Sequence, residues 1–275
     1  MHWIRVFSVL VFLPVSILAQ PEIPLEQWTG KTILLIGAHP DDDTYAHGTL
    51  AMLRANGNEV YIVLLTTGNV GTQDPKLSRY QLSEIRRQEE LAALAEVGIP
   101  ADHYVNLGYD DGMVEFADRQ EVVAQLVRQI RRLQPDVLFA FDPGPVYQRW
   151  HKSDHRAAAY LAADASRVAM WRLLFEGQII HEGLKAHRIP EFMFFDTSEK
   201  NTWIDISDFA DQKVKAGMKY VSQFGSGWSN YTGPQLSEKE LKDLEERVRG
   251  RLEMKDGKVV EGFRYYKGFP DGMGK

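Results

Sequence analysis

The sequence predicts an α/β fold: a mostly parallel, Rossmann-like sheet flanked by helices, with an α+β elaboration towards the C-terminus. Between residue 32 and about residue 170, short apolar runs alternate with segments of helical periodicity, which is the pattern of βαβ units. The apolar runs show no polar alternation, as is typical of parallel strands that are covered on both faces. Polar clusters follow two of these runs, at the sheet edge where open α/β folds bind ligands.

The first four strands are expected at apolar runs over residues 33–36, 60–66, 103–107 and 137–141. Helices are expected where apolar residues recur at helical spacing, over residues 44–56, 77–97 and 119–133 and in a segment that runs to about Met170. Gly57 ends the first helix and Gly98, followed by Pro100, ends the second. Pro135 separates the third helix from the fourth strand.

The pattern changes after about residue 183. Strands are expected over residues 192–195, 203–206 and 259–266, and helices over residues 207–224 and 237–251. Ser237 and Glu240 have the spacing of a capping box, which marks the start of the last helix. With 275 residues, 44% of them hydrophobic, the chain can bury one large core. We therefore expect one domain over residues 20–275, with a core at about 32–170 and an elaboration at about 184–275.

Charge and cysteine content narrow the function classes. The net charge of −6 and the lack of a Lys/Arg cluster give no electrostatic basis for binding nucleic acid. Without cysteine there is neither a disulfide nor a lipoprotein attachment site, although a core of this size needs no disulfide to be stable outside the cytoplasm.

Residues 1–19 have the layout of a secretory signal peptide. His2 and Arg5 give a weakly positive start, and an apolar stretch then runs from Val6 to Leu18. This stretch is short for a membrane span of about 20 residues, and Pro14 interrupts it. We expect cleavage after Ala19 and a periplasmic or secreted protein without a stable membrane span; an uncleaved anchor is the alternative.

An acidic loop, His-Pro-Asp-Asp-Asp at residues 39–43, joins the first strand to the first helix. Three successive carboxylates repel one another, and a divalent cation would remove that conflict. His39 and Asp42 face the same way if the loop curls into a helical turn, whereas Asp41 points elsewhere. An imidazole with a carboxylate suits zinc better than calcium or magnesium. Helix capping by Asp explains one or two of the carboxylates but neither His39 nor the third carboxylate.

A second polar segment follows the fourth strand and contains His151 and His155, four residues apart. Either histidine alone would mean little, because exposed histidines near helix starts are ordinary. The carboxyl ends of parallel strands share one sheet edge, so this segment is expected near the acidic loop. Together the two motifs would supply His, Asp and His, a three-ligand zinc site with an open position, which is the arrangement of catalytic sites.

On these motifs the chain resembles the LmbE/PIG-L-type zinc de-N-acetylases. Residues 38–43 match the family's Ala-His-Pro-Asp-Asp-Glu at every position but the last, where Asp43 replaces Glu. Residues 154–157, Asp-His-Arg-Ala, match the second motif, and Arg86 with Glu89 matches the Arg-x-x-Glu helix between them. The resemblance covers roughly residues 32–170.

The resemblance also implies roles for individual residues. The implied zinc ligands are His39, Asp42 and His155. Asp41 is implied to be the general base, and Asp43 to support the site or to reach a substrate hydroxyl. Arg86 is implied to contact the sugar or to order the site, and a surface ion pair with Glu89 or Glu90 is the competing interpretation.

The second motif departs from the family, which places a transition-state histidine three residues before the ligand histidine. That position is Lys152 here, and His151 lies four residues before the ligand. We expect His151 to take the role, because an imidazole can both hydrogen-bond the oxyanion and donate a proton, with Asp154 orienting it. Lys152 is the alternative source of positive charge.

These observations predict a zinc-dependent hydrolase that removes the acetyl group from an N-acetylated amino sugar or glycoconjugate. Its expected partner is a small-molecule or glycan substrate that carries an N-acetyl group. The alternatives are a non-catalytic metal- or sugar-binding relative and a metal-dependent hydrolase of another amide or ester. Neither the individual substrate nor the oligomeric state follows from the sequence.

Overall fold

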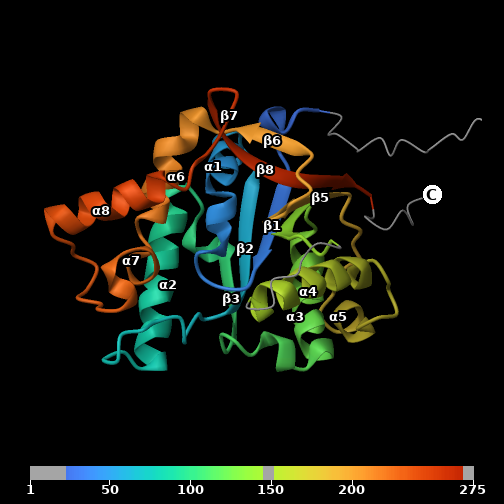
Figure 1. The fold of residues 1–275 in the computed structure, drawn as a ribbon. Helices are drawn as coiled ribbons and strands as arrows, with labels where there is room; N and C mark the ends of the chain where they lie inside the picture. Colours follow the sequence, from blue (N-terminus) through green and yellow to red (C-terminus); the bar gives the residue numbers. More distant parts are fainter. Residues whose placement is uncertain (1–22, 145–151, 269–275) are drawn as a thin grey trace, which may run out of the picture.

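A computed structural model describes residues 23–144 and 152–268, which form a central sheet between two layers of helices (Figure 1). The parallel strands are β1 (Thr32–Gly37), β2 (Glu59–Thr66), β3 (Tyr104–Tyr109), β4 (Val137–Phe141) and β5 (Glu191–Phe195), in the spatial order β3-β2-β1-β4-β5. Antiparallel strands extend the sheet beyond β5: β8 (Lys258–Lys267), with β6 (Thr202–Asp205) and β7 (Glu253–Lys255) paired to it. The expected mostly parallel sheet is confirmed.

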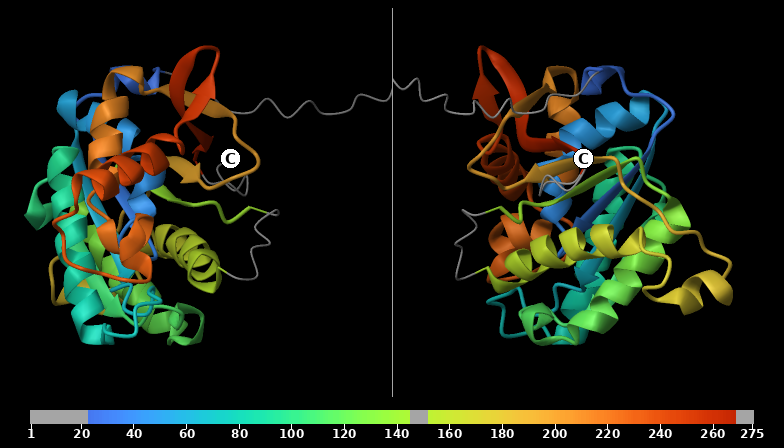
Figure 2. Two further views of the ribbon diagram at one scale, coloured as in Figure 1. Left: turned by 60° about the vertical axis from the view of Figure 1, so that its left-hand side comes forward. Right: turned by 90° about the vertical axis from the view of Figure 1, so that its right-hand side faces the viewer.

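Helices cover both faces of the sheet, as right-handed crossovers require (Figures 1 and 2). One face carries α1 (His47–Ala55) and α2 (Arg79–Glu96), and the other carries α3 (Arg119–Leu133) and α4 (Ser153–Ala169). From the C-terminal part, α6 (Ala210–Gly217) packs on α1 and α2, and α8 (Glu238–Arg249) packs on α6. Two short helices are α5 (Glu176–Ile180) and α7 (Val221–Phe224).

Local sequence chemistry explains these elements. Strand β4 is buried along its whole length and β1 at all but its first residue, as expected for strands covered on both faces. A capping box between Ser78 and Gln81 starts α2, and Gly98, with φ 77°, follows its end. The expected capping box of Ser237 and Glu240 is confirmed at the start of α8.

One expectation for the elements was wrong, and one element was not expected. The helix expected over residues 207–224 is three pieces, a 3-10 turn at Ser207–Phe209 followed by α6 and α7. The break before α7 coincides with Tyr220, which is fully buried. The hairpin of β7 and β8 was not expected, although Asp256-Gly257, with φ 52° and 77°, is a typical hairpin turn.

The sheet order fixes the place for a ligand. The order in which strands are added to the sheet reverses between the parallel neighbours β1 and β4: β2 and β3 extend the sheet on one side of β1, and β5 extends it on the other side of β4. Such a switch point opens a crevice at the carboxyl ends of the two strands. The acidic loop follows β1, and the segment that leads into α4 follows β4.

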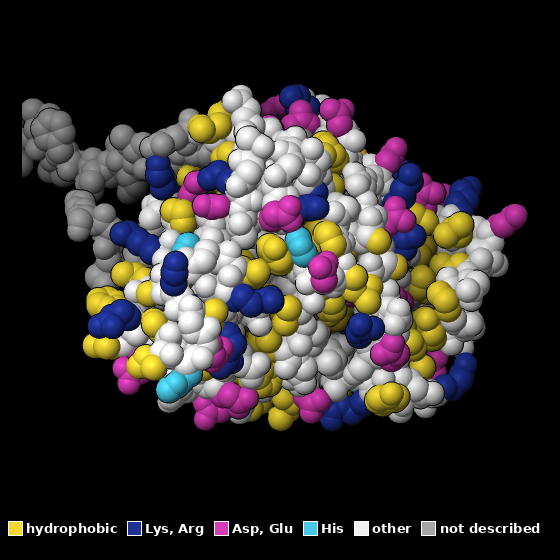
Figure 3. All heavy atoms as spheres, turned by 180° about the vertical axis from the view of Figure 1, so that it is seen from behind, with side chains coloured by type: hydrophobic (Ala, Val, Ile, Leu, Met, Phe, Trp, Pro, Cys, Tyr) yellow, Lys and Arg dark blue, Asp and Glu magenta, His cyan; other side chains and the backbone are white. Residues whose placement is uncertain are grey.

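The surface carries both signs of charge. On the face shown in Figure 3, acidic and basic side chains are interspersed, which agrees with the lack of a Lys/Arg cluster in the sequence. Within residues 23–144 and 152–268, no helix has the length and hydropathy needed to cross a membrane. The expected signal peptide and His151 lie outside the described residues.

Candidate active site

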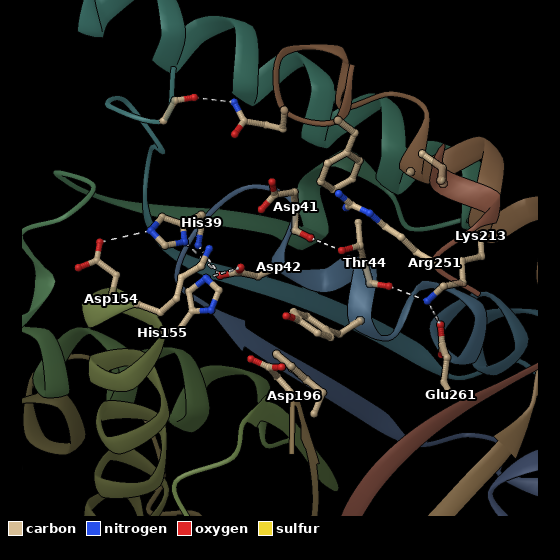
Figure 4. A pocket seen from close by; sticks show the side chains of 18 of the residues that line it. His39, Asp41, Asp42, Thr44, Asp154, His155, Asp196, Lys213, Arg251 and Glu261 are labelled. Atoms are coloured by element: carbon tan, nitrogen blue, oxygen red, sulfur yellow. Dashed lines mark hydrogen bonds and ion pairs between the residues drawn. The ribbon is translucent and has the colours of Figure 1, made fainter. Parts of the chain in front are cut away.

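The two polar motifs meet at the switch point (Figure 4). His39, Asp42 and His155 each offer a donor atom, and these atoms lie within 4.8 Å of one another. His155 Nε2 is 3.1 Å from Asp42 Oδ1, and His39 Nδ1 is 3.6 Å from Asp42 Oδ2. The structure thus brings together the three residues that the sequence suggested as metal ligands.

The Asp42 carboxylate is held in its ionised form. Its Oδ2 accepts hydrogen bonds from the backbone N–H groups of Ala38 and His39, both at 2.7 Å. Burial alone would raise the pKa of Asp42, but the neighbouring His155 and His39 outweigh that effect and hold the pKa well below its usual value. An ionised carboxylate between two imidazoles is a donor set suited to a divalent cation.

Two further carboxylates orient His39. Its Nε2 lies 3.0 Å from Asp111 Oδ1 and 3.3 Å from Asp154 Oδ2. Burial lowers the pKa of His39, but hydrogen bonds to Asp111, Asp154 and Asp42 more than offset this and raise the pKa well above 6.5. With Nε2 facing the outer carboxylates, Nδ1 is left facing Asp42, the arrangement found behind metal-ligating histidines.

His155 is fixed by packing. Its ring stacks on Phe141, the last residue of β4, with ring centroids 4.2 Å apart. Among the described residues its buried Nδ1 has no hydrogen-bond partner. Two imidazoles and one carboxylate are the ligand type of catalytic zinc sites, so the residues present fit that ion.

Asp154 has partners that the sequence did not indicate. It accepts hydrogen bonds from the N–H of Gly112 at 2.7 Å and of Val114 at 3.2 Å, which tie the loop after β3 to α4. Its expected partner, His151, lies outside the described residues, so the orienting role stays a prediction. Asp111 stands in the same loop, where turn chemistry explains an acidic residue as well as a functional role does.

Asp41 points away from the ligand cluster, as the spacing predicted. Its carboxylate lines the cavity, and Oδ2 lies 3.1 Å from Nη2 of Arg86. Burial raises the pKa of Asp41 to about 6, against the opposing effect of the Arg86 charge. A carboxylate with this pKa beside a candidate metal site is suited to accept a proton near neutral pH.

Arg86 is a buried anchor. Its side chain is only 3% exposed, and its guanidinium donates to the backbone carbonyls of Pro40 and Gly68 besides pairing with Asp41. The surface ion pair with Glu89 or Glu90 is therefore wrong. Since Arg86 also lines the cavity, it orders the loop that carries the candidate base and borders the substrate space.

Asp43 does not border the cavity, so the expectation that it reaches a substrate hydroxyl needs correction. It is fully buried, 2.8 Å from His47 Nε2 and 3.1 Å from the Tyr220 hydroxyl. Its place is beneath the acidic loop, where it supports the loop. The contact with Tyr220 spans 177 residues, so no local pattern could have indicated it.

The cavity above the cluster has a volume of about 980 Å³, near the upper end for a small-molecule site. Lys152 lines it, as do residues from the C-terminal part such as Trp228 and Arg251. In Figure 4 the Arg251 side chain extends into the pocket on the Asp41 side of the cluster, opposite Asp154.

A switch-point crevice with a His-Asp-His donor set and a separate carboxylate is the arrangement of a metal-dependent hydrolase. The family model for GlcNAc-PI de-N-acetylase (PIG-L) matches residues 34–166. The chain is 32% identical over 195 residues to diacetylchitobiose deacetylase of Thermococcus kodakarensis, covering 70% of each protein. It is 28% identical over 308 residues to a 1D-myo-inositol 2-acetamido-2-deoxy-alpha-D-glucopyranoside deacetylase of Catenulispora acidiphila, covering 92% of this chain and 94% of the relative.

A solved structure agrees with this assignment. N,N'-diacetylchitobiose deacetylase from Pyrococcus horikoshii superposes with a TM-score of 0.74 and 27% sequence identity, covering 88% of this chain and 86% of that one. The chain belongs to the PIG-L/LmbE family of deacetylases. Both the expected α/β fold and the expected enzyme class, a hydrolase of amide bonds, are confirmed.

Proposed function

We propose that this protein is a zinc-dependent N-deacetylase that releases acetate from an N-acetylglucosamine-containing saccharide. The convergence of His39 and Asp42 from the acidic loop with His155 from the first turn of α4 at one cavity carries this proposal. The relatives named for diacetylchitobiose and for an acetamido-deoxy-glucopyranoside indicate the substrate class. A cavity of about 980 Å³ accommodates a disaccharide of that kind.

The proposed zinc ligands are His39, Asp42 and His155. When bound, zinc would supply a Lewis acid for the acetamide carbonyl and lower the pKa of water to about 7. Asp41 takes a proton from the attacking water, and Arg86 keeps the Asp41 carboxylate oriented towards the cavity. The water oxygen bonds to the acetamide carbon, Asp41 returns the proton to the amine nitrogen, and the C–N bond breaks, giving acetate and a free amino sugar.

Negative charge develops on the acetamide carbonyl oxygen during the attack, and a further hydrogen-bond donor is needed to stabilise it. In this proposal His151 supplies it, and Lys152, which lines the cavity, is the alternative. His151→Ala and Lys152→Ala should be compared by kcat for acetate release. A larger loss for Lys152→Ala would reverse the assignment.

Metal analysis and an acetate assay test the function. The purified protein should contain about one zinc per chain and release acetate from N,N'-diacetylchitobiose. Asp41→Asn should keep the metal and lower kcat by at least about 100-fold, since a positioned general base contributes that much. Zinc binding without acetate release from any N-acetylated saccharide would favour a non-catalytic relative, and full activity in Asp41→Asn would refute the base assignment.

We also propose that the protein acts outside the cytoplasm after removal of residues 1–19. The apolar run and Ala19 support this. N-terminal sequencing of protein recovered from the periplasm or medium should begin at Gln20. Recovery of the intact chain from the cytoplasm alone would contradict the proposal.

A further inference from the structure

The backbone of Asp41, the candidate base, is strained. Asp41 has φ 101° and ψ −13°, a left-handed conformation that residues with a side chain rarely adopt. This conformation separates Asp41 from its neighbour, so that Asp42 joins the ligand cluster and Asp41 faces Arg86. Contacts with the surrounding structure must stabilise this backbone conformation.

Glu90 makes the contact that does so. The Asp41 N–H donates to Glu90 Oε2 at 3.1 Å, across 49 residues of sequence. Glu90 lies on α2 one turn after Arg86, so the two side chains project from the same face of the helix. Arg86 pairs with the carboxylate of Asp41 and donates to the carbonyl of Pro40, while Glu90 accepts a hydrogen bond from the Asp41 N–H.

The environment of Glu90 is unusual for a residue kept only for stability. It is fully buried, does not line the cavity, and its Oε1 has no hydrogen-bond partner among the described residues. Its Oε2 also lies 2.9 Å from the Tyr220 hydroxyl. A buried carboxyl with an unpaired oxygen is costly, and an apolar side chain would fill this space at lower cost.

We propose that Glu90 is a positioning residue for the proton transfer. Its acceptor oxygen fixes the left-handed peptide of Asp41 and thereby aims the Asp41 carboxylate at the reacting amide. Glu90 touches neither substrate nor the ligand cluster, and it acts through the Asp41 backbone. This inference rests on the proposed function, because it assigns Glu90 to the same reaction.

Shortening the side chain tests the contact. Glu90→Asp withdraws the carboxylate by about 1.5 Å, one C–C bond, which breaks the bond to the Asp41 amide. We expect kcat for acetate release from N,N'-diacetylchitobiose to fall 10- to 100-fold, with KM and zinc content within threefold of the wild type, because misplacement by about 1 Å costs that much. Glu90→Gln keeps an acceptor oxygen and should stay within threefold in kcat.

A matched control is the neighbouring Glu89→Asp. Glu89 is also buried, but its carboxylate accepts from the N–H and hydroxyl of Ser222, both at 2.7 Å. This variant should keep kcat within threefold. Equal losses in Glu89→Asp and Glu90→Asp, or a loss in Glu90→Gln as large as in Glu90→Asp, would overturn the proposal.

Two readouts separate the failure of this inference from that of the proposed function. If the wild type releases acetate and Glu90→Asp does too at an unchanged rate, only the positioning role fails. If Glu90→Asp does not fold, or the wild type is inactive, hydrogen exchange at the Asp41 amide still tests the contact. The amide should be protected in the native wild type, and exchange as fast as in an unstructured peptide would overturn the proposal.

Discussion

Replacing Arg86 by Met should destabilise the protein and slow catalysis together. The variant leaves the Asp41 carboxylate and the carbonyls of Pro40 and Gly68 without their donor. Removing one partner of a buried ion pair costs about 3–5 kcal/mol. The Asp41 side chain is 19% exposed and water can reach it, so we expect the lower end, about 3 kcal/mol, in the free energy of unfolding measured by urea titration.

Arg87→Met is the matched control for that experiment. Arg87 is 55% exposed and reaches Glu84 only at 4.0 Å, so its loss should change stability by less than about 0.5 kcal/mol. In Arg86→Met, kcat should fall while KM stays near its wild-type value, because the base loses its orientation. A stability loss below about 1 kcal/mol with a raised KM alone would show that Arg86 serves the sugar and not the loop.

Three further outcomes follow from the geometry. Gly68→Ala should cost about 1–2 kcal/mol in thermal unfolding and lower kcat, because φ is 65° and a Cβ would lie 2.5 Å from Arg86 Nη1. Burial raises the pKa of Glu89 from 4.5 to about 7, so between these pH values the folded chain holds a proton that the unfolded chain has lost. The free energy of unfolding should therefore fall by up to about 3 kcal/mol from pH 4.5 to pH 7. Urea titrations of Glu89→Gln should show a weaker dependence of this free energy on pH. Asp42→Asn should lower zinc affinity by more than about 100-fold, measured as metal retained after dialysis.

Local chemistry made most of the fold predictable. The expected bounds of α3 and β4 coincide with those observed, because each segment has a clear pattern and a Pro-containing boundary between them. The helix expected over residues 207–224 failed for a tertiary reason. Helical periodicity continues through the break, but burying the Tyr220 ring beneath the acidic loop requires the chain to turn there.

The candidate site was predictable where residues share one loop or where two motifs follow parallel strands that end at the same sheet edge. The spacing of His39, Asp41 and Asp42 within one loop determines which way each points, so the sequence could separate the suggested ligands from the suggested base. The contact of Glu90 with the Asp41 amide depends on how α2 packs on the sheet. No pattern along the chain indicates how α2 packs on the sheet, so the sequence indicated Glu90 only as a surface ion-pair partner of Arg86.

The C-terminal part also braces the site, although the family model ends at residue 166. Glu261 on β8 accepts from the N–H groups of Gly48 and Thr49 at 2.9 and 2.8 Å, which satisfies the N-terminus of α1. Lys213 on α6 pairs with Glu261 and donates to the Thr44 carbonyl at 2.7 Å. The turn that starts at Asp42 is therefore held by α6 and β8, and its geometry depends on residues that lie beyond the part of the chain that the family model matches.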